Sequence, residues 1–303
     1  MTVDVANTIL LVFAFLAAYL LPFEVLLISY AFLGPLHYLT EISWLHDRDY
    51  FTVLPNDPKI LAVTSVIVLF FGAAITPHAA ELVWLLLVLG FCMALIRSWW
   101  KRLAVIAACG LILWPLIGSV ATYALATLIP TVVHVYVFTL FFMLFGALKS
   151  KSVLGYWNTG LFAVGSFILL LLPTTDWVVL PEYVESHYSL FHDVAEVVAL
   201  FFAGTPESTI ALLASFLAFT YTYHYLNWFS KTSIIEWHAV SWKRALLIGF
   251  LYGVSVGIYL YDYVTGFIVL LTLSFVHVVL EFPLNFKSIQ GIISELGKTA
   301  KRK

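Results

Sequence analysis

The sequence predicts an all-α protein, a polytopic transmembrane helical bundle with about nine or ten spans. Of its 303 residues, 62% are hydrophobic and only 11% are charged, and the mean hydropathy is +1.00. A soluble domain carries roughly 25% charged residues, so composition alone indicates an integral membrane protein with the lipid bilayer as its partner. The formal net charge of −2 argues against nucleic acid as a partner.

Apolar stretches of about 20 residues mark candidate spans. They cover residues 7–21, 24–43, 60–76, 80–98, 103–118, 120–148, 154–173, 208–227, 243–262 and 264–284. The first two are either separate helices or one long helix kinked at Pro22, since proline can break or bend a helix. The segment 187–203 can span, re-enter or lie outside the membrane. Because no repeat or linker divides the chain, we expect one integral membrane domain over residues 1–303.

Lysine and arginine recur in alternate loops along the chain. The basic loops carry Arg48 and Lys59, then Arg97, Lys101 and Arg102, then Lys149 and Lys151, then Lys231, Lys243 and Arg244, with further lysines in the C-terminal tail. Short loops rich in Lys and Arg face the cytoplasm. The alternation therefore predicts a cytoplasmic C-terminus.

Three His-x-x-x-Glu pairs lie in or beside apolar segments, and these are His37/Glu41, His192/Glu196 and His277/Glu281. Residues four apart share one face of a helix, so the two side chains of each pair can bind one metal ion. Ionisable groups at membrane depth are costly and indicate a functional site. His192/Glu196 reaches the depth of the other two pairs only if 187–203 dips into the membrane, and a solvated outer face is an equal alternative.

Other histidines extend this candidate metal site. His224 ends the 208–227 span, and His238 follows in the aromatic stretch YHYLNWFSKTSIIEWH, which also holds Asn227 and Lys231. His134 lies deep in the 120–148 span, where it is either a further ligand or a neutral histidine bonded to a neighbouring helix. His46 reads as part of an interfacial charge cluster. The predicted ligands are His37, Glu41, His134, His192, Glu196, His224, His238, His277 and Glu281.

Imidazole and carboxylate ligands without thiolate suit iron, manganese or zinc, and open His/carboxylate sites are typical of non-haem iron enzymes that use O₂. The two cysteines, Cys92 and Cys109, lie in apolar segments and form no metal motif. We expect one or two non-haem iron ions, with zinc or haem as alternatives. The zinc-hydrolase motif H-E-x-x-H is absent from the sequence.

The aromatic-rich composition, the size and the placement of histidines on membrane helices resemble the bacterial membrane carotene-cleaving dioxygenases, which hold iron with scattered histidines. The chain contains neither the H-x-x-x-H nor the H-x-x-H-H box of membrane desaturases and hydroxylases. We expect an O₂-dependent oxygenase or desaturase-type enzyme that acts on a lipid or isoprenoid, with an electron donor as a possible partner. The alternative is a membrane transporter, or a proton or metal-ion carrier, that uses an intramembrane His/Glu pathway.

Overall fold

A computed structural model describes residues 2–75, 79–116, 128–172 and 206–300, and these residues form helices and turns with no strand among them. This confirms the all-α class. Six helical stretches are long and apolar enough to cross a membrane. They run over Val3–Leu20, Pro22–His46, Leu128–Ser150, Val153–Leu171, Trp242–Tyr261 and Tyr263–Lys298.

The predicted count of nine or ten spans is not confirmed. Helices do form over other predicted spans, namely α4 (Asp57–Ile75), α5 (Ala79–Leu95), α6 (Trp99–Leu113) and α12 (Pro206–Ser230). The helices α5 and α6 have only 17 and 15 residues, fewer than the roughly 20 that a perpendicular crossing needs. The segment 187–203 and the first part of the predicted 120–148 span lie outside the described residues.

Pro22 separates the first two helices. The helix α1 (Val3–Leu20) ends there, and Pro22 begins α2 (Pro22–Ile28), a position where its missing N–H costs no hydrogen bond. A π-helical segment, η1 (Ser29–Leu33), then joins α2 to α3 (Gly34–His46). Gly34 N–H donates to Ser29 O, five residues back, and the next residue, Pro35, has no N–H to donate. The proline thus accounts for the local change in hydrogen-bond register.

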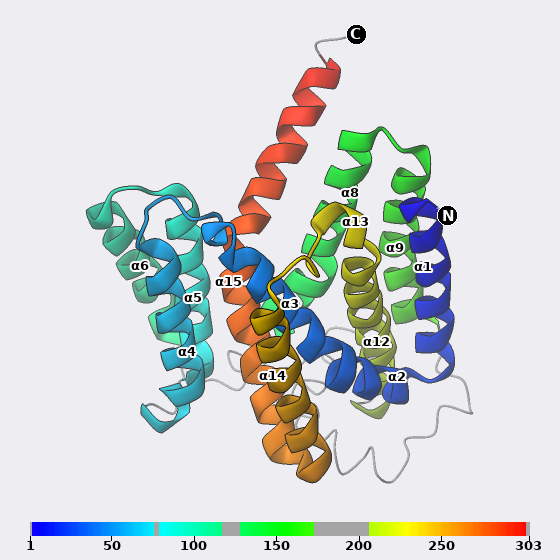
Figure 1. Ribbon diagram of the computed structural model, residues 1–303, viewed down its shortest axis with the longest axis horizontal. Coiled ribbons are helices and arrows are strands. Elements are labelled where there is room, and N and C mark those ends of the chain that lie inside the picture. Colours follow the sequence, from blue (N-terminus) through cyan, green and yellow to red (C-terminus); the bar gives the residue numbers. More distant parts are fainter. Residues whose placement is uncertain (1, 76–78, 117–127, 173–205, 301–303) are drawn as a thin grey trace.

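The last helix, α15 (Tyr263–Ala300), runs well past the end predicted for it at residue 284. Pro283 lies inside the helix instead of ending it, because a proline removes one backbone hydrogen bond and bends a helix without having to stop it. Its C-terminal turns project beyond the rest of the bundle (Figure 1). His277 therefore lies mid-helix and not in the last turns of a span.

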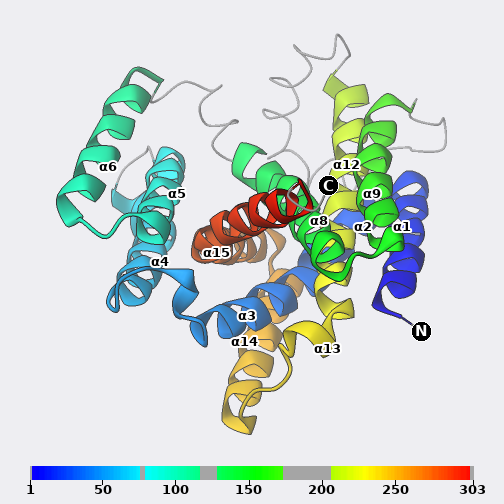
Figure 2. The same ribbon diagram turned by 90° about the horizontal axis from the view of Figure 1, so that it is seen from above.

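Helix α15 stands between two groups of helices (Figure 2). On one side lie α4, α5 and α6; on the other lie α1, α12, α8 (Thr139–Ser150) and α9 (Val153–Leu171). Each group has an apolar core of its own. The helix α3 crosses between the groups and packs against α15, as does α14 (Trp242–Tyr261).

Polar contacts join loops that the charge pattern assigns to one side of the membrane. Asp47 after α3 pairs with Arg244 in α14, at 2.6 Å, and Asp57 at the start of α4 pairs with Arg102 in α6, also at 2.6 Å. The Ser152 hydroxyl donates to Asp4 at the start of α1. These contacts agree with the predicted grouping of the basic loops on one face. The cytoplasmic assignment of that face stays a prediction.

Candidate metal site

Helix α3 presents the first pair of polar groups to the interior. His37 and Glu41 lie one turn apart, as their spacing predicts, and His37 Nε2 is 3.1 Å from Glu41 Oε2. Both side chains are buried. The π-helical segment η1 ends four residues before His37, and such segments occur frequently at functional sites.

Helix α15 presents the second pair across from α3. His277 and Glu281 are buried, and His277 Nε2 is 4.0 Å from Glu281 Oε2. The same His277 nitrogen lies 3.1 Å from Glu41 Oε2. Two of the three His-x-x-x-Glu pairs therefore meet between α3 and α15.

His134 comes from a second π-helical segment, η4 (Val133–Phe138), directly before α8. Its Nδ1 lies 2.7 Å from Glu281 Oε2, yet neither of these atoms has a hydrogen-bond partner among the described residues. The close approach therefore lacks the alignment of a hydrogen bond. This geometry is expected when both atoms are placed to bind the same third group, such as a metal ion.

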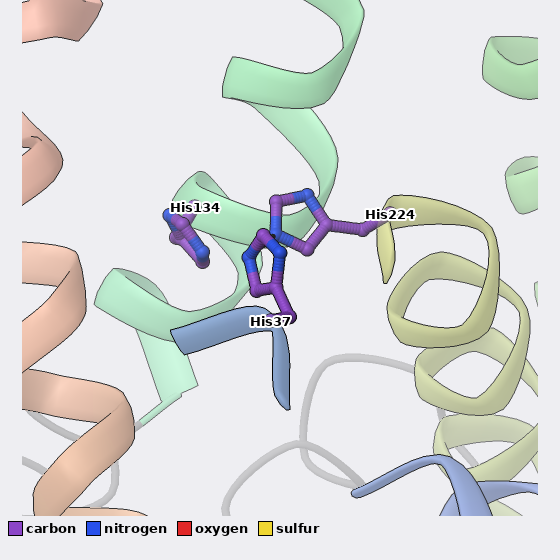
Figure 3. Close-up of side chains that lie close together, drawn as sticks. All are labelled: His37, His134 and His224. Atoms are coloured by element: carbon purple, nitrogen blue, oxygen red, sulfur yellow. Dashed lines mark hydrogen bonds between the residues drawn. The ribbon is translucent and has the colours of Figure 1, made fainter. Parts of the chain in front are cut away.

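Helix α12 supplies His224, which faces His37 with the two Nε2 atoms 2.9 Å apart. The other ring nitrogen, Nδ1, lies 2.8 Å from the Thr139 hydroxyl. Figure 3 shows His37, His134 and His224 converging from three separate elements. A hydrogen bond to one ring nitrogen fixes the ring's orientation and leaves the other free to bind a ligand.

These residues form a six-member group that we call the His/Glu cluster. Its members are His37, Glu41, His134, His224, His277 and Glu281. They form three overlapping triads, and within each triad the potential ligand atoms lie within 4.8 Å of one another. Ligands bound 2.0–2.1 Å from one ion at tetrahedral to right angles lie about 2.8–3.4 Å apart. Three close contacts of the cluster, at 2.9 and 3.1 Å, fall within that range, and the contact between His134 and Glu281, at 2.7 Å, lies just below it.

The charges and unpaired atoms of the cluster also fit a cation. Within the described part of the chain, no Lys or Arg pairs with Glu41 or Glu281, whose ion-pairing partners there are histidines. Buried carboxylates need a compensating positive charge. Beside these carboxylates, His37 Nδ1, His277 Nδ1 and both ring nitrogens of His134 lack hydrogen-bond partners. A divalent ion among the facing groups would supply the missing charge and occupy some of the unpaired donor atoms.

The described part of the chain brings no other predicted ligand into the cluster. His238 is exposed, contacts the Trp237 ring and is not part of the cluster. His192 and Glu196 lie outside the described residues. His46 is exposed beside Asp47, as expected of an interfacial charge cluster. Metal binding by the six cluster residues stays a prediction.

Sequence reasoning missed two features of the surroundings. Thr139 reads as an ordinary residue of an apolar span, and only the fold brings it to His224. The hydroxyls of Tyr38 and Tyr225 lie 2.6 Å apart next to the cluster, and the Tyr38 ring is 4.9 Å from the His277 ring. A usable signal was present for the tyrosines, because each is adjacent in sequence to a cluster histidine.

Comparison of the chain with models of protein families, with curated proteins and with solved structures gave no match.

Proposed function

We propose that the protein is an integral membrane metalloenzyme with a non-haem iron centre, which uses O₂ to oxidise a lipid or isoprenoid. The observation that supports this most is the convergence of four imidazoles and two carboxylates inside an apolar bundle. Burying imidazoles or carboxylates inside a membrane bundle is costly unless they have a partner. A donor set of nitrogen and oxygen without thiolate favours iron, manganese or zinc.

The six cluster residues would hold the metal. Iron bound there would supply the activation of O₂ for oxidation of a C–H or C=C bond. Haem fits poorly, because the His134 and His277 rings are only 4.7 Å apart between centroids. Two axial Fe–N bonds of about 2 Å each already separate the nitrogen atoms by about 4 Å, before the depth of the rings is added.

The chain's own residues would orient the ligands and exclude water. Thr139 fixes His224 through its hydroxyl. The rings of Tyr225, Trp228 and Phe229 surround His37 with centroids 5.1–6.4 Å from it. Such a water-poor surrounding would limit side reactions of a strong oxidant. An apolar substrate would reach it from the bilayer.

Metal analysis of the purified protein tests the proposal. After anaerobic loading with Fe(II), we expect about one or two tightly held iron ions per chain, and reductant-dependent O₂ consumption that rises when a lipid or isoprenoid is added. Loading with Zn(II) serves as the matched control and should give metal binding without O₂ consumption. A protein that retains no metal under any loading condition contradicts the proposal.

One observation favours the alternative of a carrier. On α15, Asn285 and Ser288 continue the face of His277 and Glu281, all four are buried, and the Asn285 amide has no hydrogen-bond partner in the described structure. A polar stripe of this kind could carry protons or a cation toward the end of α15. Flux into proteoliposomes in the absence of O₂ and reductant would support the carrier, and its absence alongside O₂ consumption would support the enzyme.

A further inference from the structure

A cavity of about 500 Å³ lies beside the His/Glu cluster, between the starts of α1 and α9 and the ends of α8 and α12. This volume is typical of sites for small organic ligands. Part of its wall is apolar, with Val3, Phe142, Met143, Ala147 and Ile234 among the lining residues. The metal proposal does not use this space.

Three polar residues of the wall come from one face of α12 and the turn after it, and the other polar residues lie at the start of α1, at the end of α8 and on α9. Tyr223, Asn227 and Lys231 follow one another at intervals of four residues and all line the cavity. Asn227 is only 6% exposed, and its side-chain amide has no hydrogen-bond partner among the residues described. Asn227 lines the cavity, so a ligand there would meet an amide whose hydrogen-bonding capacity the described residues leave unused.

Lys231 adds a positive charge that no carboxylate neutralises by direct contact. It is half-buried and forms no ion pair within the described part of the chain. Burial lowers the pKa of Lys231 to about 8, against a weaker opposing influence of Asp4. The Asp4 carboxylate is itself occupied, because it accepts a hydrogen bond from Ser152.

The charge balance of the cavity favours an anion. Two lysines, Lys149 and Lys231, line it against one carboxylate, Asp4. The N-terminal ends of α1 and α9 and the C-terminal ends of α8 and α12 all border it, so the helix dipoles oppose one another and the charged side chains decide the balance. An anionic group next to Lys231 and Asn227 would meet a positive charge and an unpaired N–H donor.

From this arrangement we infer that the cavity binds an amphiphile through an oxyanion head group, a carboxylate or a phosphate, which Lys231 and Asn227 hold while the alkyl part lies against Phe142 and Met143. No cluster residue lines the cavity, but neighbours of the cluster residues do. Tyr223 and Asn227 flank His224 on α12, and Met143 lies one turn beyond Thr139, which contacts His224. Naming this amphiphile as the enzyme's substrate or product rests on the proposed function, whereas its binding does not.

The test measures binding to the full-length protein in nanodiscs of zwitterionic lipid, with empty nanodiscs as the blank. The probes are octanoate, octyl phosphate, inorganic phosphate and 1-octanol. We expect octanoate or octyl phosphate to bind at least about 10-fold more tightly than both octanol, which lacks the charge, and inorganic phosphate, which lacks the chain. Equal binding of octanol would exclude the anion site, and equal binding of inorganic phosphate would exclude a site for an amphiphile.

Variants locate the site. Lys231→Met should weaken binding of the anionic amphiphile by about 10-fold or more, while Lys243→Met, the same change at an exposed lysine, should leave it unchanged. Should Lys231→Met fail to fold, Asn227→Ala carries the same expectation with the charge retained. Wild-type affinity in the folded variants would overturn the inference.

Metal content separates this inference from the proposed function. Lys231 lies outside the His/Glu cluster, so Lys231→Met should retain iron as the wild type does. If Lys231→Met retains iron and binds the amphiphile as the wild type does, this inference is wrong and the proposed function is unaffected. If the protein binds the amphiphile in a way that depends on Lys231 but never holds iron, the proposed function is wrong and this inference is unaffected.

Discussion

Two regions of this bundle bury ionisable groups, and they do so in opposite ways. Between α4 and α6, Asp57 and Arg102 are both fully buried and form two parallel hydrogen bonds of 2.6 and 2.7 Å. Arg102 Nε also donates to Ile96 O, and Asp57 accepts from Leu54 N–H. Charge and hydrogen bonds are both satisfied there by the chain itself.

The His/Glu cluster between α3, α12, α15 and η4 is different. Among the described residues, its carboxylates have no Lys or Arg partner, and several of its ring nitrogens have no hydrogen-bond partner. A buried ionic group satisfied by its own chain needs nothing further, whereas an incompletely paired cluster needs a ligand. The first arrangement indicates a structural role and the second a binding site.

The largest expected effect is the loss of iron when a ligand of the His/Glu cluster is removed. His277→Ala deletes a group that belongs to two of the three triads, so we expect stoichiometric iron to fall to background. Metal analysis after gel filtration measures it. His238→Ala, at an exposed histidine outside the cluster, is the matched control. Full iron content in His277→Ala would show that the cluster assignment is wrong.

The satisfied pair should respond through stability and not through metal. Arg102→Met leaves Asp57 buried without its partner, which costs about 3–5 kcal/mol, whereas replacing both residues by apolar ones of similar size costs far less. Thermal unfolding of Arg102→Met and of the double variant Asp57→Leu/Arg102→Met measures both. The folded fraction of each should retain iron. A double variant no more stable than Arg102→Met would contradict a structural ion pair.

Much of this contrast could not be read from the sequence. The i, i+4 spacing and apolar surroundings of His37/Glu41 and His277/Glu281 predicted both pairs, since helix periodicity is a local property. By contrast, the sequence places Arg102 among the basic loop residues, and nothing around Asp57 predicts a buried ion pair. Their pairing spans 45 residues and depends on how α4 and α6 pack. The same holds for Thr139, which meets His224 across 85 residues.

The end of the last helix was also missed. The last span is predicted to end at residue 284, next to Pro283, yet α15 continues to Ala300, because a proline removes one backbone hydrogen bond without having to end the helix. Hydropathy measures composition and not burial. The spans that it predicts over α5, α6 and α12 are not confirmed, because the helices α5 and α6 are short and α12 carries buried threonines, tyrosines and His224.

A smaller effect tests how the cluster is oriented. Thr139→Val removes the hydroxyl that lies 2.8 Å from His224 Nδ1 while keeping the side-chain shape. Loss of such a supporting contact typically lowers metal affinity 10–100-fold. Competition with a calibrated chelator measures the change. Thr139→Ser should restore affinity, and Thr272→Val, at a half-buried threonine bonded only within its own helix, should have none of this effect. Wild-type affinity in Thr139→Val would mean that His224 needs no support.

The smallest effect comes from a pair that repeats the Asp57–Arg102 chemistry at the surface. Asp47 and Arg244 are 43% and 33% exposed, so solvent screens them and Asp47→Asn should cost at most about 1 kcal/mol at pH 7. The hydrogen bond from Arg244 lowers the pKa of Asp47, assisted by His46. Such a carboxylate contributes its stability above its unfolded-state pKa, near 3.9, and loses it as the pH falls through the lower folded-state value. The difference in Tm between Asp47→Asn and the wild type should therefore be constant from pH 6 to 8 and shrink below about pH 4. If Asp47→Asn lowered the free energy of unfolding as much as Arg102→Met does, burial would not be what distinguishes the two ion pairs. The contrast between the Asp57–Arg102 pair and the His/Glu cluster would then need another physical basis.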